Sequence, residues 1–199
     1  MGTADIDIRV TTMAEQAGMA GRIADLALQR FRLDGFAGTS VADLATALGI
    51  SKAAVYYHYR SKTELLHRLV DPLLDAIDAC IDAHGIPPGT DATIRPATDV
   101  RRLLADYLAA LTAQRPVAAL VASDTAVINH PEIGPRIREQ NRRLRTMLAA
   151  QDASVPATLR AEAALGAIWR PLVTELDVSV ADAVHQQTLV DAAVAVLDR

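Results

Sequence analysis

Hydroxyl, imidazole and ammonium groups are concentrated in one short stretch of the chain, residues 51–62. They belong to Ser51, Lys52, Tyr56, Tyr57, His58 and Lys62. Groups of this kind form hydrogen bonds with phosphate oxygens, and such contacts fix the register of a protein on a nucleic acid without reading its sequence. Ala53 and Ala54 lie among them, and their small side chains allow a backbone to approach base edges closely. The stretch is therefore suited to binding a nucleic acid.

Two short helices joined by a tight turn must position these groups. Thr39 or Ser40 can cap the first helix, because a hydroxyl there accepts a hydrogen bond from a free first-turn N–H. Gly49 is placed where a left-handed residue ends the first helix, and Ser51 can cap the second helix two residues later. Two helices that meet at a sharp angle over a glycine-containing turn form a helix-turn-helix, whose second helix can enter the major groove of DNA.

Helical periodicity assigns the two faces of the second helix. At about 100° per residue, Val55 and Tyr59 share a face, which we expect to be buried. Ala53 and Tyr57 then point outward. Lys62 begins the next helix, where a cation and free N–H groups can hold a phosphate together. The predicted DNA-contacting residues are Thr39, Ser40, Ser51, Lys52, Ala53, Ala54, Tyr56, Tyr57, His58 and Lys62.

The segment from Gly35 to Lys62 resembles the DNA-binding domain of TetR-family transcriptional repressors. The similarity is carried above all by the run Gly-Ile-Ser-Lys-Ala-Ala-Val-Tyr-Tyr-His-Tyr-Arg-Ser-Lys over residues 49–62, followed by Glu64-Leu65-Leu66, and it extends over residues 20–70. The resemblance implies an all-α homodimer with an N-terminal DNA-binding domain and a larger C-terminal domain that binds a small ligand and dimerises. Tyr59 departs from the family, which more often has Phe there, but it keeps an aromatic side chain in that place.

The composition fits a helical protein of one or two domains. Of the 199 residues, 51% are hydrophobic but only 4% are aromatic, which suits helices packed through small residues. The formal net charge of −4, taken alone, argues against nucleic-acid binding. Residues 17–67, however, hold six basic residues against four acidic ones, a net charge of +2. A mildly basic N-terminal part joined to an acidic remainder keeps the non-specific affinity for nucleic acid modest, while its basic residues can still contact phosphates locally.

We predict three parts along the chain: a flexible N-terminal arm over residues 1–16, a helix-turn-helix DNA-binding domain over 17–63, and a ligand-binding and dimerisation domain over 64–199. Apolar periodicity predicts helices over residues 18–34, 61–83, 99–114, 116–128, 132–150, 156–177 and 180–198. Several Gly and Pro residues predict a loop over 84–98. The helix over 61–83 enters the last part from the DNA-binding one, so it can carry a shift from a ligand to the DNA-reading helices.

The last two predicted helices are apolar on more than one side, so one chain can cover them only in part. A two-fold interface of four helices, two from each subunit, solves this problem, and we therefore expect a homodimer through residues 156–198. Two recognition helices set about one helical turn of DNA (~34 Å) apart would then bind a pseudo-palindromic double-stranded operator.

A small-molecule effector is the second expected partner. The helices after residue 64 should surround an apolar cavity, as ligand pockets in helical domains do. The candidate ligand contacts are Tyr107, Trp169, Met147 and Thr174, with His130, Asn129 and Gln140 as further possibilities. An apolar lining favours a lipophilic or aromatic effector. The arginines over residues 136–145 leave two interpretations open: an anionic ligand or DNA contact, or a solvated face with ion pairs.

The leading hypothesis is a repressor that its effector releases from DNA, although the sign of the coupling is not in the sequence. The alternative is a helical small-molecule-binding protein, or an enzyme, whose helix-turn-helix serves protein contacts. We do not expect an enzyme, because the sequence has no Gly-rich phosphate loop, Cys-x-x-Cys or nucleophile elbow. The spacing of the five histidines suggests no metal site, and we expect no cofactor.

Cysteine usage and hydropathy bear on the compartment. Cys80 is the single cysteine, so an intramolecular disulfide is excluded, and a small buried side chain is its simplest role. Residues 1–16 are polar and acidic, unlike a signal peptide, and no uncharged apolar run reaches 18 residues. These features predict a cytoplasmic protein without a membrane partner.

Overall fold

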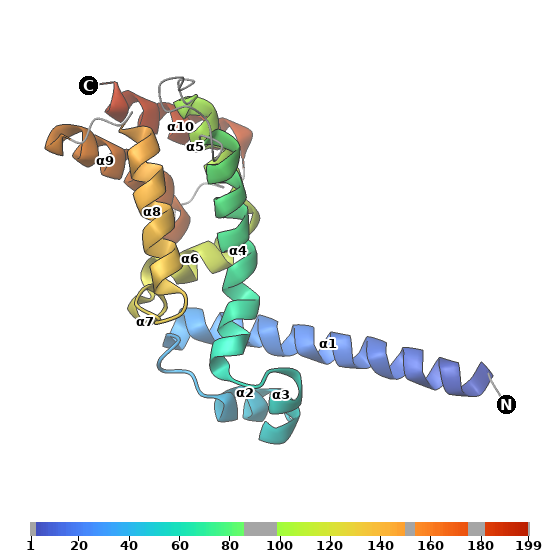
Figure 1. Ribbon diagram of the computed structural model, residues 1–199. Coiled ribbons are helices and arrows are strands. Elements are labelled where there is room, and N and C mark those ends of the chain that lie inside the picture. Colours follow the sequence, from blue (N-terminus) through green and yellow to red (C-terminus); the bar gives the residue numbers. More distant parts are fainter. Residues whose placement is uncertain (1–2, 86–98, 150–153, 175–181, 199) are drawn as a thin grey trace. The chain divides into compact units, whose positions relative to one another are not determined.

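The computed structural model describes residues 3–85, 99–149, 154–174 and 182–198. Within these ranges every regular element is a helix, which confirms the expected all-α class (Figure 1). The described chain divides into two compact units, Met1–Val70 and Asp71–Arg199, which we call the head and the body. The division falls inside one helix, α4 (Lys62–His84), whose first turns belong to the head. The boundary predicted after residue 63 falls in the same helix.

The head contains α1 (Thr3–Asp34), α2 (Val41–Leu48), α3 (Lys52–His58) and the start of α4. Its core gathers apolar side chains from all of these helices. The Phe31 and Phe36 rings meet edge to face with their centroids 5.1 Å apart, where the chain leaves α1. The buried apolar residues of the head are Ile23, Ala27, Phe31, Phe36, Val41, Leu44, Ala45, Val55, Tyr59, Leu65, Leu66 and Val70.

Helix α1 begins at Thr3, so the arm expected over residues 1–16 is helical from its third residue. The expectation rested on the lack of apolar periodicity. Periodicity, however, indicates which side of a helix packs against a core, whereas propensity and helix breakers decide whether a helix forms. Residues 3–17 contain neither Gly nor Pro, and nothing in them ends the helix.

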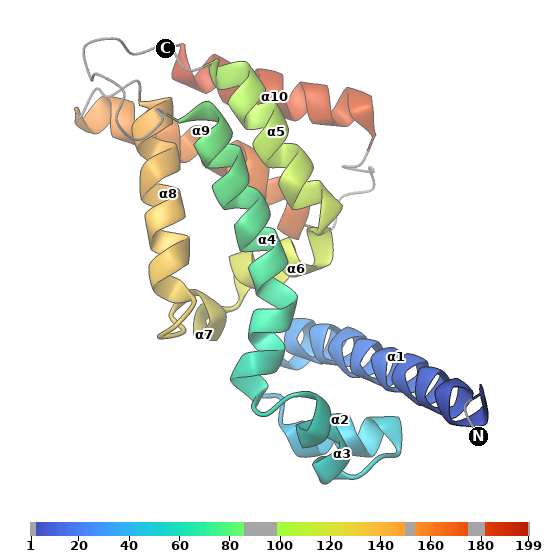
Figure 2. The same cartoon turned by 45° about the vertical axis from the view of Figure 1, so that its right-hand side comes forward.

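The body contains the rest of α4, α5 (Val100–Ala113), α6 (Arg115–Ser123), α7 (Thr125–Ile128), α8 (Gly134–Leu148), α9 (Val155–Val173) and α10 (Ala183–Leu197). Helix α10 packs against α9 and α5, as Figure 2 shows. The single helix expected over residues 116–128 is two helices. Asp124 ends α6, where its backbone N–H donates to the Leu120 carbonyl (3.0 Å), and its carboxylate caps α7 by accepting hydrogen bonds from the N–H groups of Ala126 (2.8 Å) and Val127 (3.3 Å).

The predicted apolar face of α5 is confirmed, because Leu103, Leu104, Tyr107, Leu108 and Leu111 are all buried. Most of the predicted loop over 84–98 and the end of the helix predicted over 156–177 lie outside the described residues. None of the described helices combines the length and the apolar character that crossing a membrane requires.

Candidate functional site

Helix α2 starts at a reciprocal cap formed by Ser40 and Asp43. The Ser40 hydroxyl accepts a hydrogen bond from the Asp43 N–H (3.1 Å), and the Asp43 carboxylate accepts one from the Ser40 N–H (2.9 Å). These bonds satisfy two N–H groups that a helix start otherwise leaves without partners. The hydrogen bonds from Ser40 also hold the pKa of Asp43 below its usual value. Ser40, one of the two predicted caps, therefore fixes where α2 begins.

The turn into α3 follows the predicted local rules. Gly49 ends α2 in the left-handed conformation, with a φ of 66°, which a residue without Cβ adopts at little cost. Ser51 then caps α3, and its hydroxyl accepts a hydrogen bond from the Ala54 N–H at 3.1 Å. Cap and glycine thus set the angle at which α3 leaves the turn.

The inner side of α3 is the predicted one. Val55 and Tyr59 keep only 1% and 7% of their surface exposed. The Tyr59 hydroxyl donates a hydrogen bond to the Ala20 carbonyl of α1 (3.0 Å), and burial raises the pKa of this tyrosine. Tyr59 therefore does more than fill the core: its hydroxyl, which Phe lacks, ties α3 to α1.

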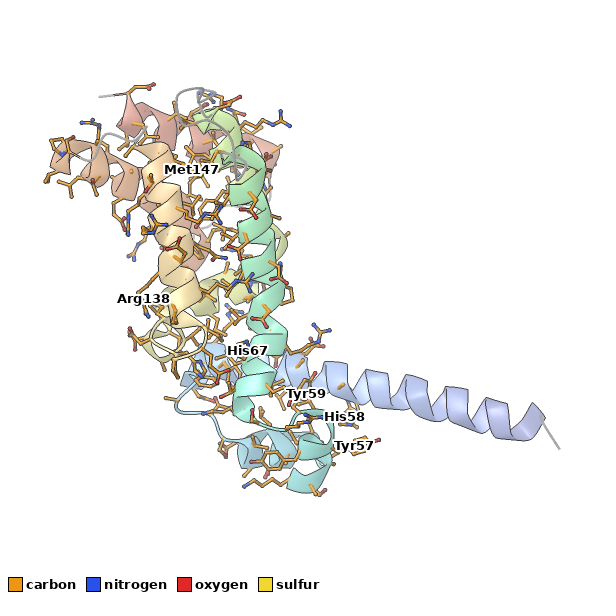
Figure 3. All side chains as sticks on the ribbon, in the orientation of Figure 1. Tyr57, His58, Tyr59, His67, Arg138 and Met147 are labelled. Carbon is orange, nitrogen blue, oxygen red and sulfur yellow. The ribbon has the colours of Figure 1, made fainter. Side chains whose placement is uncertain are left out.

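The outer side of α3 carries the predicted polar groups. Ser51, Lys52 and Ala53 are exposed, and Tyr57 is 71% exposed. Figure 3 shows Tyr57 extending outward from α3 beside His58, whose ring it meets edge to face at 5.2 Å. The Lys52 ammonium lies 5.7 Å from the centre of the Tyr56 ring. We name this surface, formed by residues 51–53, 56 and 57, the outer face of α3.

Two predicted contact residues are placed differently. Thr39 keeps only 3% exposure, and its hydroxyl donates to the Gly35 carbonyl (3.0 Å), so its side chain faces the protein interior. Lys62 is half-buried, and its ammonium donates to the carbonyls of Phe36 (2.8 Å) and Thr39 (2.9 Å). The ammonium also lies 4.4 Å from the centre of the Phe36 ring. Lys62 thus joins the start of α4 to the segment between α1 and α2, a role that we did not predict.

The outer face of α3 combines an ammonium, hydroxyls and small side chains on a convex, solvent-exposed helix. Hydroxyl and ammonium groups suit phosphate oxygens, and exposed alanine leaves room for a groove edge. Among the described residues, no group of three His, Cys, Asp or Glu side chains is arranged to hold a metal ion. The ammonium and hydroxyl groups of this face are of the kind that form hydrogen bonds with phosphate oxygens.

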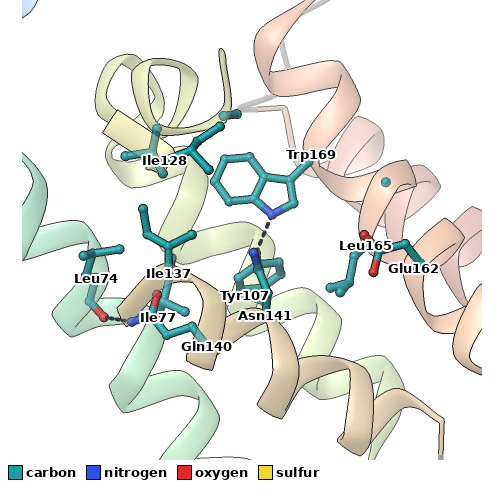
Figure 4. Close-up of a pocket in the computed structure, with 13 residues that line it drawn as sticks. Leu74, Ile77, Tyr107, Ile128, Ile137, Gln140, Asn141, Glu162, Leu165 and Trp169 are labelled. Atoms are coloured by element: carbon teal, nitrogen blue, oxygen red, sulfur yellow. Dashed lines mark hydrogen bonds between the residues drawn. The ribbon is translucent and has the colours of Figure 1, made fainter. Parts of the chain in front are cut away.

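The body contains a cavity of about 280 Å³, lined by thirteen residues of α4 to α9 (Figure 4). Tyr107 and Trp169, two of the predicted ligand contacts, lie in its wall. The Trp169 indole N–H donates a hydrogen bond to the Tyr107 hydroxyl, and their rings meet edge to face at 6.3 Å. Because Tyr107 is almost fully buried, desolvation raises its pKa above the usual range, and the hydroxyl stays neutral.

Met147 and Thr174, the other two predicted contacts, are not among the residues that line the cavity. Met147 lies two turns beyond Gln140 on α8, and Thr174 follows the last residue of α9, where its hydroxyl donates to the Arg170 carbonyl (2.9 Å). Periodicity gave the inner face of each helix, but it does not say how far along the helix a cavity extends.

The polar lining contains Gln140, one of the further possibilities named from the sequence, and also Asn141 and Glu162, which we did not predict. Gln140 is 3% exposed, and its amide N–H donates to the Leu74 carbonyl of α4 at 2.8 Å. Its helical register with the apolar positions Ile137 and Leu144 places it on the inner side of α8.

The arginines of α8 form ion pairs, as the second of the two interpretations held. Arg136 contacts the carboxylates of Asp75 (2.5 Å) and Asp78 (2.6 Å) on α4, and Arg143 contacts Asp82 at 2.6 Å. Arg142 pairs with Glu139, and Arg145 with Glu162. These pairs engage four of the five arginines: Arg136 and Arg143 join α8 to α4, Arg145 joins it to α9, and Arg142 is paired within α8.

Comparison with known proteins places the head in a sequence family. The family model described as "Bacterial regulatory proteins, tetR family" matches residues 23–69. The HTH-type transcriptional regulator TtgR of Pseudomonas putida is 33% identical over 67 residues, which are 34% of this chain and 32% of TtgR. The biofilm operon icaADBC HTH-type negative transcriptional regulator IcaR of Staphylococcus epidermidis is 36% identical over 53 residues, 27% of this chain and 29% of IcaR. The chain thus spans about a third of the length of these curated relatives.

Solved structures match over most of the chain. A member of the TetR transcriptional regulator family from Streptomyces coelicolor A3 superposes with a TM-score of 0.67 at 25% identity, covering 88% of each chain. The ketosteroid transcriptional regulator KstR2 of Mycobacterium tuberculosis superposes with a TM-score of 0.66 at 19% identity, covering 90% of this chain and 93% of its own, which is a likeness of fold. With the helix-turn-helix, the family model and these matches in agreement, the chain belongs to the TetR family of transcriptional regulators.

Proposed function

We propose that the chain is a DNA-binding transcriptional regulator that inserts α3 into the major groove of an operator. The observation that carries the proposal is the two-sided character of α3. Val55 and Tyr59 hold one side in the core, while Lys52 and Tyr57 stand exposed on the other. A recognition helix needs this division, because one side must be fixed by packing while the other meets base edges and phosphates.

We propose in addition that the chain forms a homodimer through α9 and α10. On α9, Val155 (71% exposed) and Leu159 (63% exposed) begin an exposed stripe that Ala163 and Gly166 continue. On α10, Val184 (71% exposed) begins a second exposed stripe, made of Val184, Thr188, Ala192 and Ala195. Two adjacent helices with small and apolar exposed stripes can form a close four-helix interface with a second copy. The two α3 helices of such a dimer would occupy half-sites about 34 Å apart on a pseudo-palindromic operator.

We propose repression as the mode of action and a small molecule in the body cavity as its signal. One relative, IcaR, is named as a negative transcriptional regulator, and the cavity offers space for an effector. Leu74 and Ile77 of the cavity wall belong to α4, the helix that carries Lys62 at its start. An effector that binds the DNA-incompetent arrangement more tightly would release the operator, and a nearly complete release needs about 3–5 kcal/mol of differential affinity. A bacterial protein with this role acts where the chromosome lies, in the cytoplasm.

The test is a gel shift of the full chain with genomic fragments at low and at higher salt. We expect tight binding to a few fragments that weakens steeply with salt, because phosphate contacts release counterions. Tyr57→Ala should weaken binding while the thermal unfolding curve stays unchanged, since this side chain is 71% exposed. Leu33→Ala, a change at an equally exposed side chain of α1, is the matched control and should leave binding unchanged.

Two results would refute the proposal. One is a chain that binds no duplex at low ionic strength. The other is a Tyr57→Ala variant that binds as tightly as the wild type, because DNA would then not meet the outer face of α3.

A further inference from the structure

We propose that the body cavity takes an uncharged, largely apolar molecule with one carbonyl or ether oxygen, which accepts a hydrogen bond from the Tyr107 hydroxyl. The inference names the chemical class of the proposed effector. It rests on the proposed function only in assuming that this molecule regulates DNA binding. Whether the cavity selects such a molecule is a property of the body alone.

The size and the walls of the cavity favour a compact apolar ligand. Its volume of about 280 Å³ lies at the lower end of the range for ligand pockets, about 300–1,000 Å³. Leu74, Ile77, Ile137 and Leu165 line it together with the ring of Trp169. This space suits a molecule of one or two rings, and it is too small for a long acyl chain or a nucleotide conjugate.

The charges of the lining disfavour ions. Glu162 is the single charged residue among the thirteen that line the cavity, and its carboxylate lies 3.3 Å from the Arg145 guanidinium. An anionic ligand would meet this carboxylate and no lining cation, while a cationic ligand would have to share the carboxylate with Arg145. Either ion would lose its hydration without gaining a full partner, which costs more free energy than burying an uncharged group.

The Tyr107 hydroxyl supplies the directional contact. Its oxygen accepts the Trp169 indole N–H, and an indole can only donate, so the tyrosine O–H must donate elsewhere. The hydroxyl donates no hydrogen bond to any of the described residues, although the side chain is 1% exposed and lines the cavity (Figure 4). A buried donor without an acceptor is unfavourable, and a ligand oxygen removes that penalty.

Gln140 provides a second polar position. Its N–H is engaged by the Leu74 carbonyl, so its amide oxygen is left as an acceptor at the cavity wall. A hydroxyl or amide N–H next to the ligand oxygen would satisfy it. The lining thus offers one neutral donor and one neutral acceptor in apolar surroundings.

Four probes of nearly equal shape test the inference on the full chain: 4-phenyl-2-butanone, 3-phenylpropionate, 3-phenylpropylammonium and butylbenzene. Binding is followed by the fluorescence of Trp169, the single tryptophan of the chain, excited at a wavelength that the probes absorb little. We expect the ketone to bind at least about tenfold more tightly than either ion, because neither ion finds a free partner charge.

The variant Tyr107→Phe isolates the hydroxyl. We expect it to lower the affinity for the ketone about fivefold relative to that for butylbenzene, the usual effect of one neutral hydrogen bond. Butylbenzene binding by the variant also shows that the cavity is intact. Tyr56→Phe removes a tyrosine hydroxyl from the head and is the matched control, which should leave all four affinities unchanged.

Three results would overturn the inference: an ion that binds as tightly as the ketone, an unchanged ratio of ketone to butylbenzene affinity in Tyr107→Phe, or no binding of any probe up to its solubility limit. If Tyr107→Phe does not fold, the order of the four probes on the wild-type chain decides. The gel shift without probe tests the proposed function separately. A chain that binds DNA but shows no selectivity among the probes therefore refutes this inference alone. A chain that selects the ketone but binds no DNA refutes only the proposed function as a transcriptional regulator.

Discussion

Replacing Lys62 by alanine should destabilise the head, although a lysine at a helix start next to α3 looks like a simple phosphate contact. The ammonium donates two hydrogen bonds, to the carbonyls of Phe36 and Thr39, and lies over the Phe36 ring. Because the lysine is half-buried, we take about 1 kcal/mol for each hydrogen bond, below the usual range for charged donors. The cation–π contact adds about 0.5–1 kcal/mol. Lys62→Ala should therefore lower the free energy of unfolding of the head by about 2–3 kcal/mol.

Amide hydrogen exchange, read separately for the head and the body, is the appropriate assay, because a single melting curve would mix the two units. The slowest amides of α2 and α3 should exchange about 30–150 times faster in Lys62→Ala, which corresponds to the same 2–3 kcal/mol. Lys52→Ala is the matched control. It removes the same charge from an exposed site, where substitutions usually change stability by less than about 0.5 kcal/mol.

The reasoning fails if both variants leave exchange in the head unchanged and weaken DNA binding equally. Lys62 would then act through phosphate contact, and its hydrogen bonds to the two carbonyls would contribute nothing measurable to folding.

Three further predictions concern single side chains. Val55→Ala should destabilise the head by about 1.5–3 kcal/mol, because it leaves a cavity at a side chain that is 1% exposed; an exchange pattern in α3 like that of the wild type would contradict this. In Ser40→Ala, NMR titration should show the pKa of Asp43 closer to its ordinary value of 3.8, since the hydrogen bond with the Ser40 side chain is the largest cause of the depression. Because the folded pKa is the lower one, this stabilisation is present above the unfolded pKa and is lost as the pH falls through the folded pKa, so the difference in stability between the two proteins should narrow in acid to the contribution of the cap bond from the Asp43 N–H. Burial raises the pKa of the Cys80 thiol from its ordinary value of 9.0 to about 11, so at pH 8 thiol reagents should label the folded chain about a hundredfold more slowly than the unfolded chain. Equal labelling rates would show that solvent reaches Cys80 in the folded chain.

The parts of the head that the sequence predicted well are those set by neighbours along the chain. Gly49 and Ser51 act within one helical turn, and the 3.6-residue period alone separates Val55 from Tyr57. The partners of Lys62 are 26 and 23 residues away, at Phe36 and Thr39, so no local pattern contains them. Thr39 illustrates the same limit, because either Thr39 or Ser40 could have capped α2, and packing of the preceding segment decided between them.

The cavity was predictable in kind but not in extent. Tyr107 and Trp169 were singled out because each is a large aromatic with a polar group, and the structure brings both into one wall. Met147 shares the face of Gln140 on α8 but lies two turns farther along, beyond the cavity. Where a cavity begins and ends depends on how several helices meet, which is a tertiary property.

The arginines of α8 and the lysines of the head support a common principle about charge and partner choice. A basic residue contributes to polyanion binding only while its donors remain hydrated, since phosphate must otherwise displace a partner. Four of the five α8 arginines contact carboxylates, and two N–H groups of Lys62 contact carbonyls. The Lys52 ammonium lies over the Tyr56 ring, and within the described part of the chain neither it nor the Arg60 guanidinium forms an ion pair. The DNA-binding surface is therefore better indicated by the few cations beside α3 that form no such pairs than by the larger number of arginines on α8 or by the net charge of −4.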